Sequence, residues 1–183
     1  MRQKQLFYGG VPVPFTVSWS DEEKFLVDFC SHAQRQAICQ VEARGGGKPL
    51  FGKPHSNRQR QVIALGLCDL CASPLQNRTK VSLSHARPVM HGAQGVAVLQ
   101  VEPLLHRECA ATSLGHCPSL RRDVEAGTLM VRQVTRWRAQ FAVMDEVYVE
   151  EITGHRCQAI GHAKVELLDW IDREPGWLMK LPT

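Results

Sequence analysis

The chain has 183 residues, of which 44% are apolar and 22% are charged, and its formal net charge is +4. This composition is typical of one globular unit, and a chain of this length buries roughly 70% of the surface that it exposes when unfolded. The longest uncharged apolar stretches, such as residues 62–67, are too short to span a bilayer, which excludes an integral membrane protein. The seven cysteines are odd in number and widely spaced, and residues 1–10 have no charged-then-apolar leader pattern. We therefore expect a reducing, cytoplasmic location.

Residues 1–43 are expected to form an edge strand followed by an amphipathic helix. Residues 11–19 alternate in polarity and contain two prolines, which favours a strand at a sheet edge. The sequence Ser-Asp-Glu-Glu at 20–23 has the pattern of a capping box, and apolar residues recur every four positions from Phe25 to Val41. This pattern predicts a helix over residues 21–43 that ends before the glycines at 45–47. The alternating strand residues Val13, Phe15, Val17 and Trp19 are core candidates.

Residues 44–61 contain five basic residues and no acidic one: Arg44, Lys48, Lys53, Arg58 and Arg60. Glycine, proline and polar residues dominate this segment, so it is predicted to be a flexible basic loop. Such a loop is either a solvated linker or a surface that neutralises nucleic-acid phosphates, with Phe51 available to stack on a base.

The segment 62–120 carries a pattern of metal ligands. Cys68 and Cys71 are separated by two residues, and after 34 intervening residues His106 and Cys109 repeat that spacing. Zinc prefers thiolate and imidazole ligands in a tetrahedral arrangement, so these four side chains predict a structural Zn²⁺ site with no open position for a substrate. His116 and Cys117 are reserve ligands, and buried cysteines with a nearby surface histidine are the alternative interpretation.

The order of the elements around these ligands is typical of a treble-clef zinc finger. The CxxC turn is followed by two alternating apolar runs at 79–84 and 96–101, which predict a β-hairpin with a broad loop. A helix beginning at Pro103 then places His106 and Cys109 one turn apart. The expected fold class is α+β, with a treble-clef-like zinc subdomain embedded in a small mixed body that forms a single domain over 1–183.

Residues 121–183 are expected to contain a β-rich segment and a C-terminal helix. Two β-rich runs lie at 128–134 and 138–144, and apolar residues at helical spacing predict a helix over 161–172. Arg132, Arg136 and Arg138 share the same parity along an extended segment, so they either form a second basic stripe for phosphate binding or belong to an ordinary solvated face.

An enzymatic alternative centres on His85. The sequence Ser-His-Ala-Arg-Pro at 84–88, between the two ligand pairs, resembles the histidine-bearing strand of HNH nucleases, where the histidine activates water beside a divalent metal. That pattern also needs an asparagine and a second histidine on the following helix, but both asparagines, Asn57 and Asn77, precede His85. No other catalytic motif is present in the sequence.

Several segments together resemble a family of uncharacterised phage and prophage proteins. They are residues 13–19 (VPFTVSW), 67–71 (LCDLC), 102–110 (EPLLHRECA), 116–120 (HCPSL) and 127–131 (GTLMV). The resemblance implies a viral origin and a zinc-stabilised fold. We therefore expect an accessory protein that binds DNA or RNA in the host cytoplasm, or alternatively a docking module that binds a host transcription or defence factor.

Overall fold

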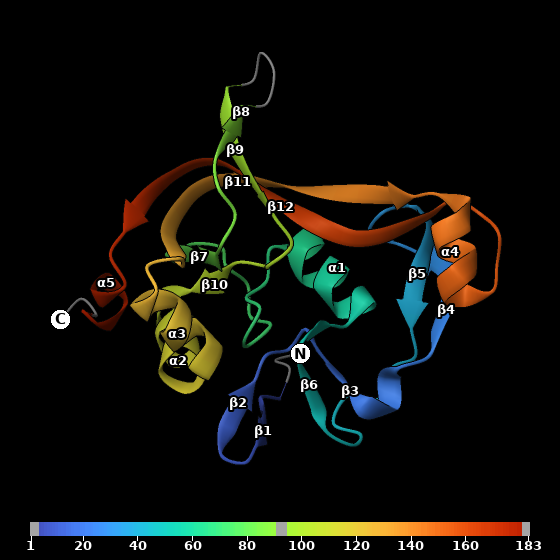
Figure 1. The fold of residues 1–183 in the computed structure, drawn as a ribbon, viewed down its shortest axis with the longest axis horizontal. Coiled ribbons are helices and arrows are strands. Elements are labelled where there is room, and N and C mark those ends of the chain that lie inside the picture. Colours follow the sequence, from blue (N-terminus) through green and yellow to red (C-terminus); the bar gives the residue numbers. More distant parts are fainter. Residues whose placement is uncertain (1–3, 91–94, 181–183) are drawn as a thin grey trace.

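The computed structural model describes residues 4–90 and 95–180, and its mixture of helices and strands confirms the predicted α+β class (Figure 1). The strands are β1 (Leu6–Tyr8), β2 (Val11–Val13), β3 (Val17–Trp19), β4 (Phe25–Cys30), β5 (Arg35–Gln40), β6 (Pro49–Pro54), β7 (Lys80–Ser84), β8 (Val89–Met90), β9 (Val96–Gln100), β10 (Leu105–His106), β11 (Met130–Met144) and β12 (Ala159–Arg173). The α-helices are α1 (Ser56–Leu65), α2 (Arg107–His116), α3 (Pro118–Glu125), α4 (Glu146–Thr153) and α5 (Gly176–Met179), and Ser20–Glu22 forms a 3₁₀ turn.

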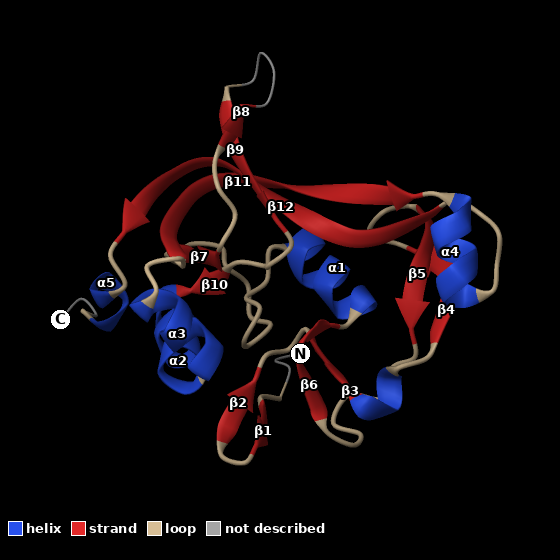
Figure 2. Ribbon diagram, viewed as in Figure 1, coloured by secondary structure: helices blue, strands red, loops and turns tan. Residues whose placement is uncertain are grey.

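The long antiparallel ribbon of β11 and β12 is the centre of the main sheet. Each strand has 15 residues, and together they arch over α1 (Figure 2). The sheet order is β10-β7-β11-β12-β5-β4, and β9 joins it beside β12. Figure 1 shows α2, α3 and α5 gathered at one end of the arch and α4 at the other, while β8 and β9 project away from the body.

One edge of β12 is shared by two strands. β5 pairs with it in parallel at Ile160, and β9 pairs with it in antiparallel fashion from Val165 to Leu167. Helix α1 satisfies backbone groups in the interval between these strands. The Gln59 side chain hydrogen-bonds both the N–H and the carbonyl of Ala163, and Arg60 donates to the carbonyl of Gly161. The polar face of α1 is therefore buried because it completes a sheet edge.

The metal-ligand region and the sheet share one hydrophobic core. Cys68 and Leu70 from the CxxC turn lie in the same buried cluster as Val131 of β11 and Leu167 of β12. Leu178 of α5 is also fully buried in this cluster. The predicted subdomain is thus packed into the body of the protein rather than attached to it by a linker.

The N-terminal region differs from its prediction. The four stripe residues Val13, Phe15, Val17 and Trp19 are buried as expected, but they belong to β2, β3 and their connection rather than to one strand. The predicted helix over 21–43 is wrong, because β4 and β5 form an antiparallel hairpin there. Apolar residues four apart, such as Phe25 and Phe29, also share one face of a strand, and pairing with β5 decides for the strand.

The flexible loop predicted over 44–61 is also wrong. Its second half forms β6 and the first part of α1. β6 pairs with β3, and the His55 side chain caps α1 by accepting from the Arg58 backbone N–H. Residues 44–48 lie in a loop, as predicted. The residues after them form regular elements, and several of the polar side chains of α1 are buried.

The predicted helix over 161–172 is a strand. Ala163, Val165 and Leu167 of β12 are buried at a spacing of two, which is the period of a strand with one face in the core. The C-terminal helix is instead the short α5, and α4 was not predicted. Pairing with β11 along nearly the whole of β12 outweighs the helical spacing of its apolar residues.

Candidate metal centre

The turn that carries Cys68 and Cys71 is built from backbone hydrogen bonds. The Cys68 N–H donates to the Ser73 carbonyl (2.9 Å) and the Ala72 N–H donates to the Cys68 carbonyl (2.8 Å). Ala72 takes a left-handed conformation (φ 53°), which closes the turn. The Asp69 N–H donates to the Leu104 carbonyl (3.0 Å) and so joins the turn to the segment that precedes His106.

His106 and Cys109 come from the junction of β10 and α2. Leu105 and His106 pair with Val81 and Lys80 of β7, so the helix begins at Arg107 and not at Pro103 as predicted. His106 is the N-cap residue and Cys109 lies in the first helical turn. The paired strands before this helix are β7 and β10, whereas the predicted hairpin of the runs at 79–84 and 96–101 does not form. β8 and β9 form a separate hairpin, which lies between β7 and β10 in the chain.

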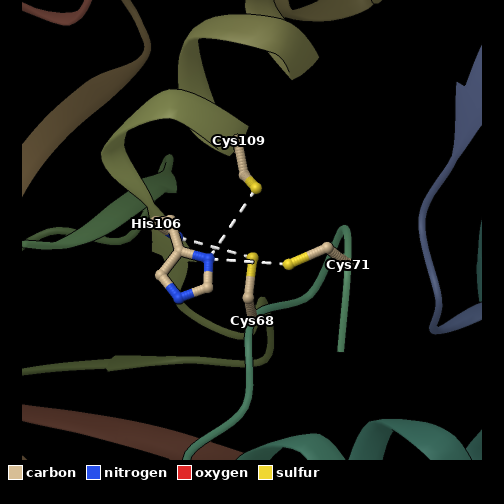
Figure 3. A group of neighbouring side chains, drawn as sticks. All are labelled: Cys68, Cys71, His106 and Cys109. Atoms are coloured by element: carbon tan, nitrogen blue, oxygen red, sulfur yellow. Dashed lines mark hydrogen bonds between the residues drawn. The ribbon is translucent and has the colours of Figure 1, made fainter. Parts of the chain in front are cut away.

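The four predicted ligands lie together (Figure 3). One ligand atom from each of Cys68, Cys71, His106 and Cys109 lies within 4.8 Å of the other three, and the cysteines form no disulfide. The His106 Nδ1 atom lies 3.5 Å from the Cys71 sulfur and 3.8 Å from the Cys109 sulfur. Zinc bonds of about 2.3 Å to sulfur and 2.1 Å to nitrogen in a tetrahedron separate such atoms by about 3.6 Å. The arrangement can therefore hold a metal ion.

The hydrogen bonds of His106 select the ring nitrogen that faces the sulfurs. Its Nε2 atom lies 2.9 Å from the Pro74 carbonyl oxygen. A carbonyl only accepts hydrogen bonds, so Nε2 carries the proton and the Nδ1 lone pair of the neutral ring points at the cysteines. A carbonyl that orients a ligating histidine in this way is a common feature of metal sites.

The three sulfurs affect one another's ionisation. Hydrogen bonds from Cys109 and Cys68 lower the pKa of Cys71 below its ordinary value, and contact with Cys68 and Cys71 raises the pKa of Cys109. The pKa of Cys68 is raised to about 11, because a hydrogen bond with Cys109 that lowers it is outweighed by one with Cys71 and by burial. Three thiolates this close together need a cation between them, which is the chemistry of a metal site.

The reserve ligands His116 and Cys117 lie elsewhere. His116 ends α2, and Cys117 is the junction residue between α2 and α3. Among the described residues, neither belongs to a group of potential metal ligands. The α2 helix separates them from His106 by its full length.

A second group of potential ligands contains Glu22, Glu42 and His55. Here the guanidinium of Arg58 lies where a metal cation would bind. It donates to both Glu22 carboxylate oxygens (2.7 Å each) and to Glu42, and it also donates to the carbonyls of Phe15 and Val17. We interpret this group as an ion-pair network that ties α1 to the N-terminal strands.

Most of the predicted phosphate-binding residues in 44–61 are engaged within the protein. Arg58 and Arg60 are buried (2% and 1% exposed), so they cannot contact a phosphate, and that prediction is wrong for them. Arg44 is half-buried over the Phe15 ring and donates to the Lys4 carbonyl. Lys53 is exposed and pairs with Glu23 (3.5 Å), and Lys48 is exposed.

The predicted arginine stripe on β11 is divided between the two faces of the strand. Arg132 is fully buried and donates to the Ala86 carbonyl (2.7 Å), which is a correction to its assignment as a phosphate ligand. Register shifts between Val134 and Trp137 change the parity of the strand. Arg136 and Arg138 are consequently exposed, and Arg138 pairs with Glu166.

His85 follows β7 and is exposed. Its Nε2 atom lies 3.3 Å from a carboxylate oxygen of Asp123 on α3. Within residues 4–90 and 95–180 it belongs to no group of three potential metal ligands. Neither of the two asparagines substitutes for the one that the HNH pattern needs. Asn57 hydrogen-bonds Gln40, and Asn77 has a left-handed backbone conformation in a turn. The geometry therefore gives the nuclease alternative no support.

Two features of the site had no signal in the sequence. The Pro74 carbonyl that orients His106 is a backbone group, which any residue would supply. The ion-pair partners Glu22 and Arg58 lie 36 positions apart and have no motif spacing.

Comparisons with known proteins found no matching family model, no similar curated protein and no similar solved structure. None of the helices in the described part of the chain has the length and apolar content to cross a membrane.

Proposed function

We propose that the Cys68–Cys71–His106–Cys109 centre binds Zn²⁺ as a structural ion and that the scaffold it supports binds nucleic acid. Three thiolates and one imidazole form a donor set that suits Zn²⁺ better than the hard cations Mg²⁺ or Ca²⁺. With four protein ligands the coordination shell is complete, so the ion holds the CxxC turn to α2 and leaves no position for a substrate. The bound centre carries a net charge near −1.

The projecting hairpin of β8 and β9 carries the nucleic-acid proposal. Arg87 lies two residues before β8, and its side chain is exposed. No acidic residue occurs between Leu70 and Val101, so this segment of the chain, which includes the hairpin, carries only positive formal charge. A narrow two-stranded ribbon with apolar side chains and an arginine at its base suits a nucleic-acid groove, where cations contact phosphates and apolar groups contact bases.

The other exposed cations are secondary parts of this surface. Arg136 lies on β11, which pairs with β12, and β9 pairs with the opposite edge of β12. Lys48, Lys53 and Arg44 lie far along the chain from the hairpin and are not needed for the proposal. The resemblance to phage proteins supports placing this activity in the cytoplasm of a host cell.

The test is binding of the zinc-loaded protein to labelled single- and double-stranded DNA and RNA over a series of salt concentrations. Affinity should fall steeply with salt, and Arg87→Gln should weaken binding to all sequences and reduce the slope of log K against log salt by about 1. Arg35→Gln is the control, because Arg35 is an exposed arginine on β5, away from the hairpin. Equal losses in both variants, or no binding at low salt, would contradict the proposal.

A protein partner is the second candidate, and the exposed apolar side chains of the hairpin favour it. Val89, Met90 and Val96 are 53%, 73% and 49% exposed. Exposed apolar residues on a projecting element are typical of a surface that docks to another protein. Met90→Ser would weaken a protein complex strongly and leave its salt dependence small, whereas Arg87→Gln would have little effect on such a complex.

A further inference from the structure

A cavity lies away from the metal centre, between β6, α4 and the hairpin of β4 and β5. Its volume is about 320 Å³, which is near the lower limit of the roughly 300–1,000 Å³ of small-molecule sites. Phe25 of β4, Met144 of β11, and Tyr148 and Ile152 of α4 line it. These side chains provide an apolar, partly aromatic interior.

The electrostatic environment of this cavity is set by a buried charge behind its wall. The Arg60 guanidinium is 1% exposed, and it donates to the carbonyls of Ile38 (2.8 Å) and Gly161 (2.9 Å), both of which line the cavity. The ion pairs formed by the described residues do not include Arg60. Its positive charge is therefore not neutralised locally and acts on the cavity through a medium of low dielectric constant.

His162 is a polar residue on the wall of the cavity whose ionisation responds to this buried charge. It lines the cavity, and its Nδ1 atom is buried without a hydrogen-bond partner. Burial and the charge of Arg60 lower the pKa of His162, so the imidazole is neutral at pH 7. The side chain can thus hydrogen-bond a ligand without adding a second positive charge.

The mouth of the cavity carries one charge of each sign. Lys53 of β6 and Glu23 both line it, and their side chains form an exposed ion pair of 3.5 Å. An anion that enters would replace the Glu23 carboxylate as the partner of Lys53. A cation could replace Lys53 as the partner of Glu23 at the mouth, but the field of Arg60 would oppose its entry into the cavity.

We propose that this cavity binds a small organic anion with an aromatic body. The ring lies among Phe25, Met144 and Ile152, and the anionic group contacts Lys53 at the mouth. Apolar burial supplies the affinity, and the two positive charges supply the preference for an anion over a neutral molecule of the same shape.

The experiment compares benzoate, benzamide and benzylammonium as probes of the zinc-loaded protein, with amide and methyl chemical shifts followed by NMR. Benzoate should produce saturable shifts at Phe25, Tyr148 and Ile152 and bind at least threefold more tightly than benzamide, and benzylammonium should not bind. Lys53→Gln should reduce benzoate affinity toward that of benzamide, with the remaining preference due to Arg60, and Glu23→Gln should increase benzoate affinity. Both side chains are more than half exposed, so neither substitution threatens folding.

Two results would overturn the proposal. One is equal binding of the three probes, which would remove the preference for an anion. The other is a set of shifts that does not saturate or that lies outside the cavity. Ile152→Phe serves as a further variant, since the larger side chain occupies the cavity and should abolish the binding of every probe.

Discussion

Gln59 and Ala163 are 104 residues apart in sequence and exchange two hydrogen bonds. The Gln59 Nε2 atom donates to the Ala163 carbonyl (2.8 Å), and the Ala163 N–H donates to Gln59 Oε1 (3.0 Å). This is the pattern that a neighbouring strand would provide. One side chain of α1 thus replaces a strand at the interval of β12 between β5 and β9, and the same amide also donates to the Val101 carbonyl (2.8 Å).

Gln59→Leu should strongly destabilise the protein. The substitution leaves the N–H and the carbonyl of Ala163 buried without partners, and each such group costs about 1–3 kcal/mol. We expect the free energy of unfolding to fall by about 3 kcal/mol or more and the Tm by about 10 °C. Urea and thermal unfolding measure both quantities. Gln61→Leu is the control, since Gln61 is half-buried and its side chain makes no hydrogen bond in the described structure; a comparable loss there would refute the explanation.

The Glu22–Arg58 pair should be essential for folding stability. Arg58→Met leaves the fully buried Glu22 carboxylate without its cation, and removing one partner of a buried pair costs about 3–5 kcal/mol. The double variant Glu22→Gln with Arg58→Met should be more stable than Arg58→Met alone, because no unpaired charge remains. Chemical denaturation of the wild type, of Arg58→Met, of Glu22→Gln and of the double variant measures the coupling free energy. Strictly additive losses would show that the two residues do not act as a pair.

The same pair predicts how stability depends on pH. Burial alone would raise the pKa of Glu22, but hydrogen bonds from Arg58 and from the Trp19 and Ala43 amides outweigh it and hold the pKa below its ordinary value of 4.5. A lowered folded-state pKa stabilises the protein above the unfolded-state pKa, and this stabilisation is lost as the pH falls through the folded-state value. The urea midpoint should therefore decrease below about pH 4.5. In Glu22→Gln this decrease should be smaller, and an unchanged profile would disprove the assignment.

Metal content and stability should be lost together when a ligand is removed. Cys71→Ser removes one of the four ligands and should reduce zinc bound per chain to a small fraction of the wild-type value, with a lower Tm. Cys117→Ser is the matched control, because Cys117 is a half-buried cysteine outside the ligand group. Elemental analysis and calorimetry give the two readouts. A zinc-free Cys71→Ser protein of wild-type stability would exclude a structural role for the ion.

Trp177 should report on the metal centre. Its ring lies between the guanidinium groups of Arg107 (4.2 Å) and Arg173 (5.2 Å). Arg107 directly follows His106, so loss of the metal should disturb α2 and release α5. Chelation should then change the tryptophan fluorescence, and Trp177→Phe should abolish most of that change. Trp170→Phe should preserve it, and the opposite order of effects would show that α5 does not respond to the centre.

The four members of the candidate metal centre can be identified from local sequence features. Ligand chemistry restricts a zinc site to a few residue types, and two CxxC-type spacings suffice to name the four members before any fold is known. The stripe from Val13 to Trp19 was equally readable, because alternation in polarity is a local property. The α+β class also followed from local patterns.

The conformations of the polar and ambiguous segments depend on contacts with distant parts of the chain. Arg58, Gln59 and Arg60 look like a solvated basic loop in sequence, and they are buried because distant carboxylates and carbonyls in β12 and the N-terminal strands become their partners. The segments at 21–43 and 161–172 have apolar residues at spacings that fit both a helix and a strand. The pairing of β4 with β5 and of β12 with β11 resolves that ambiguity, and the partner of a residue in another strand leaves no local trace in its own segment.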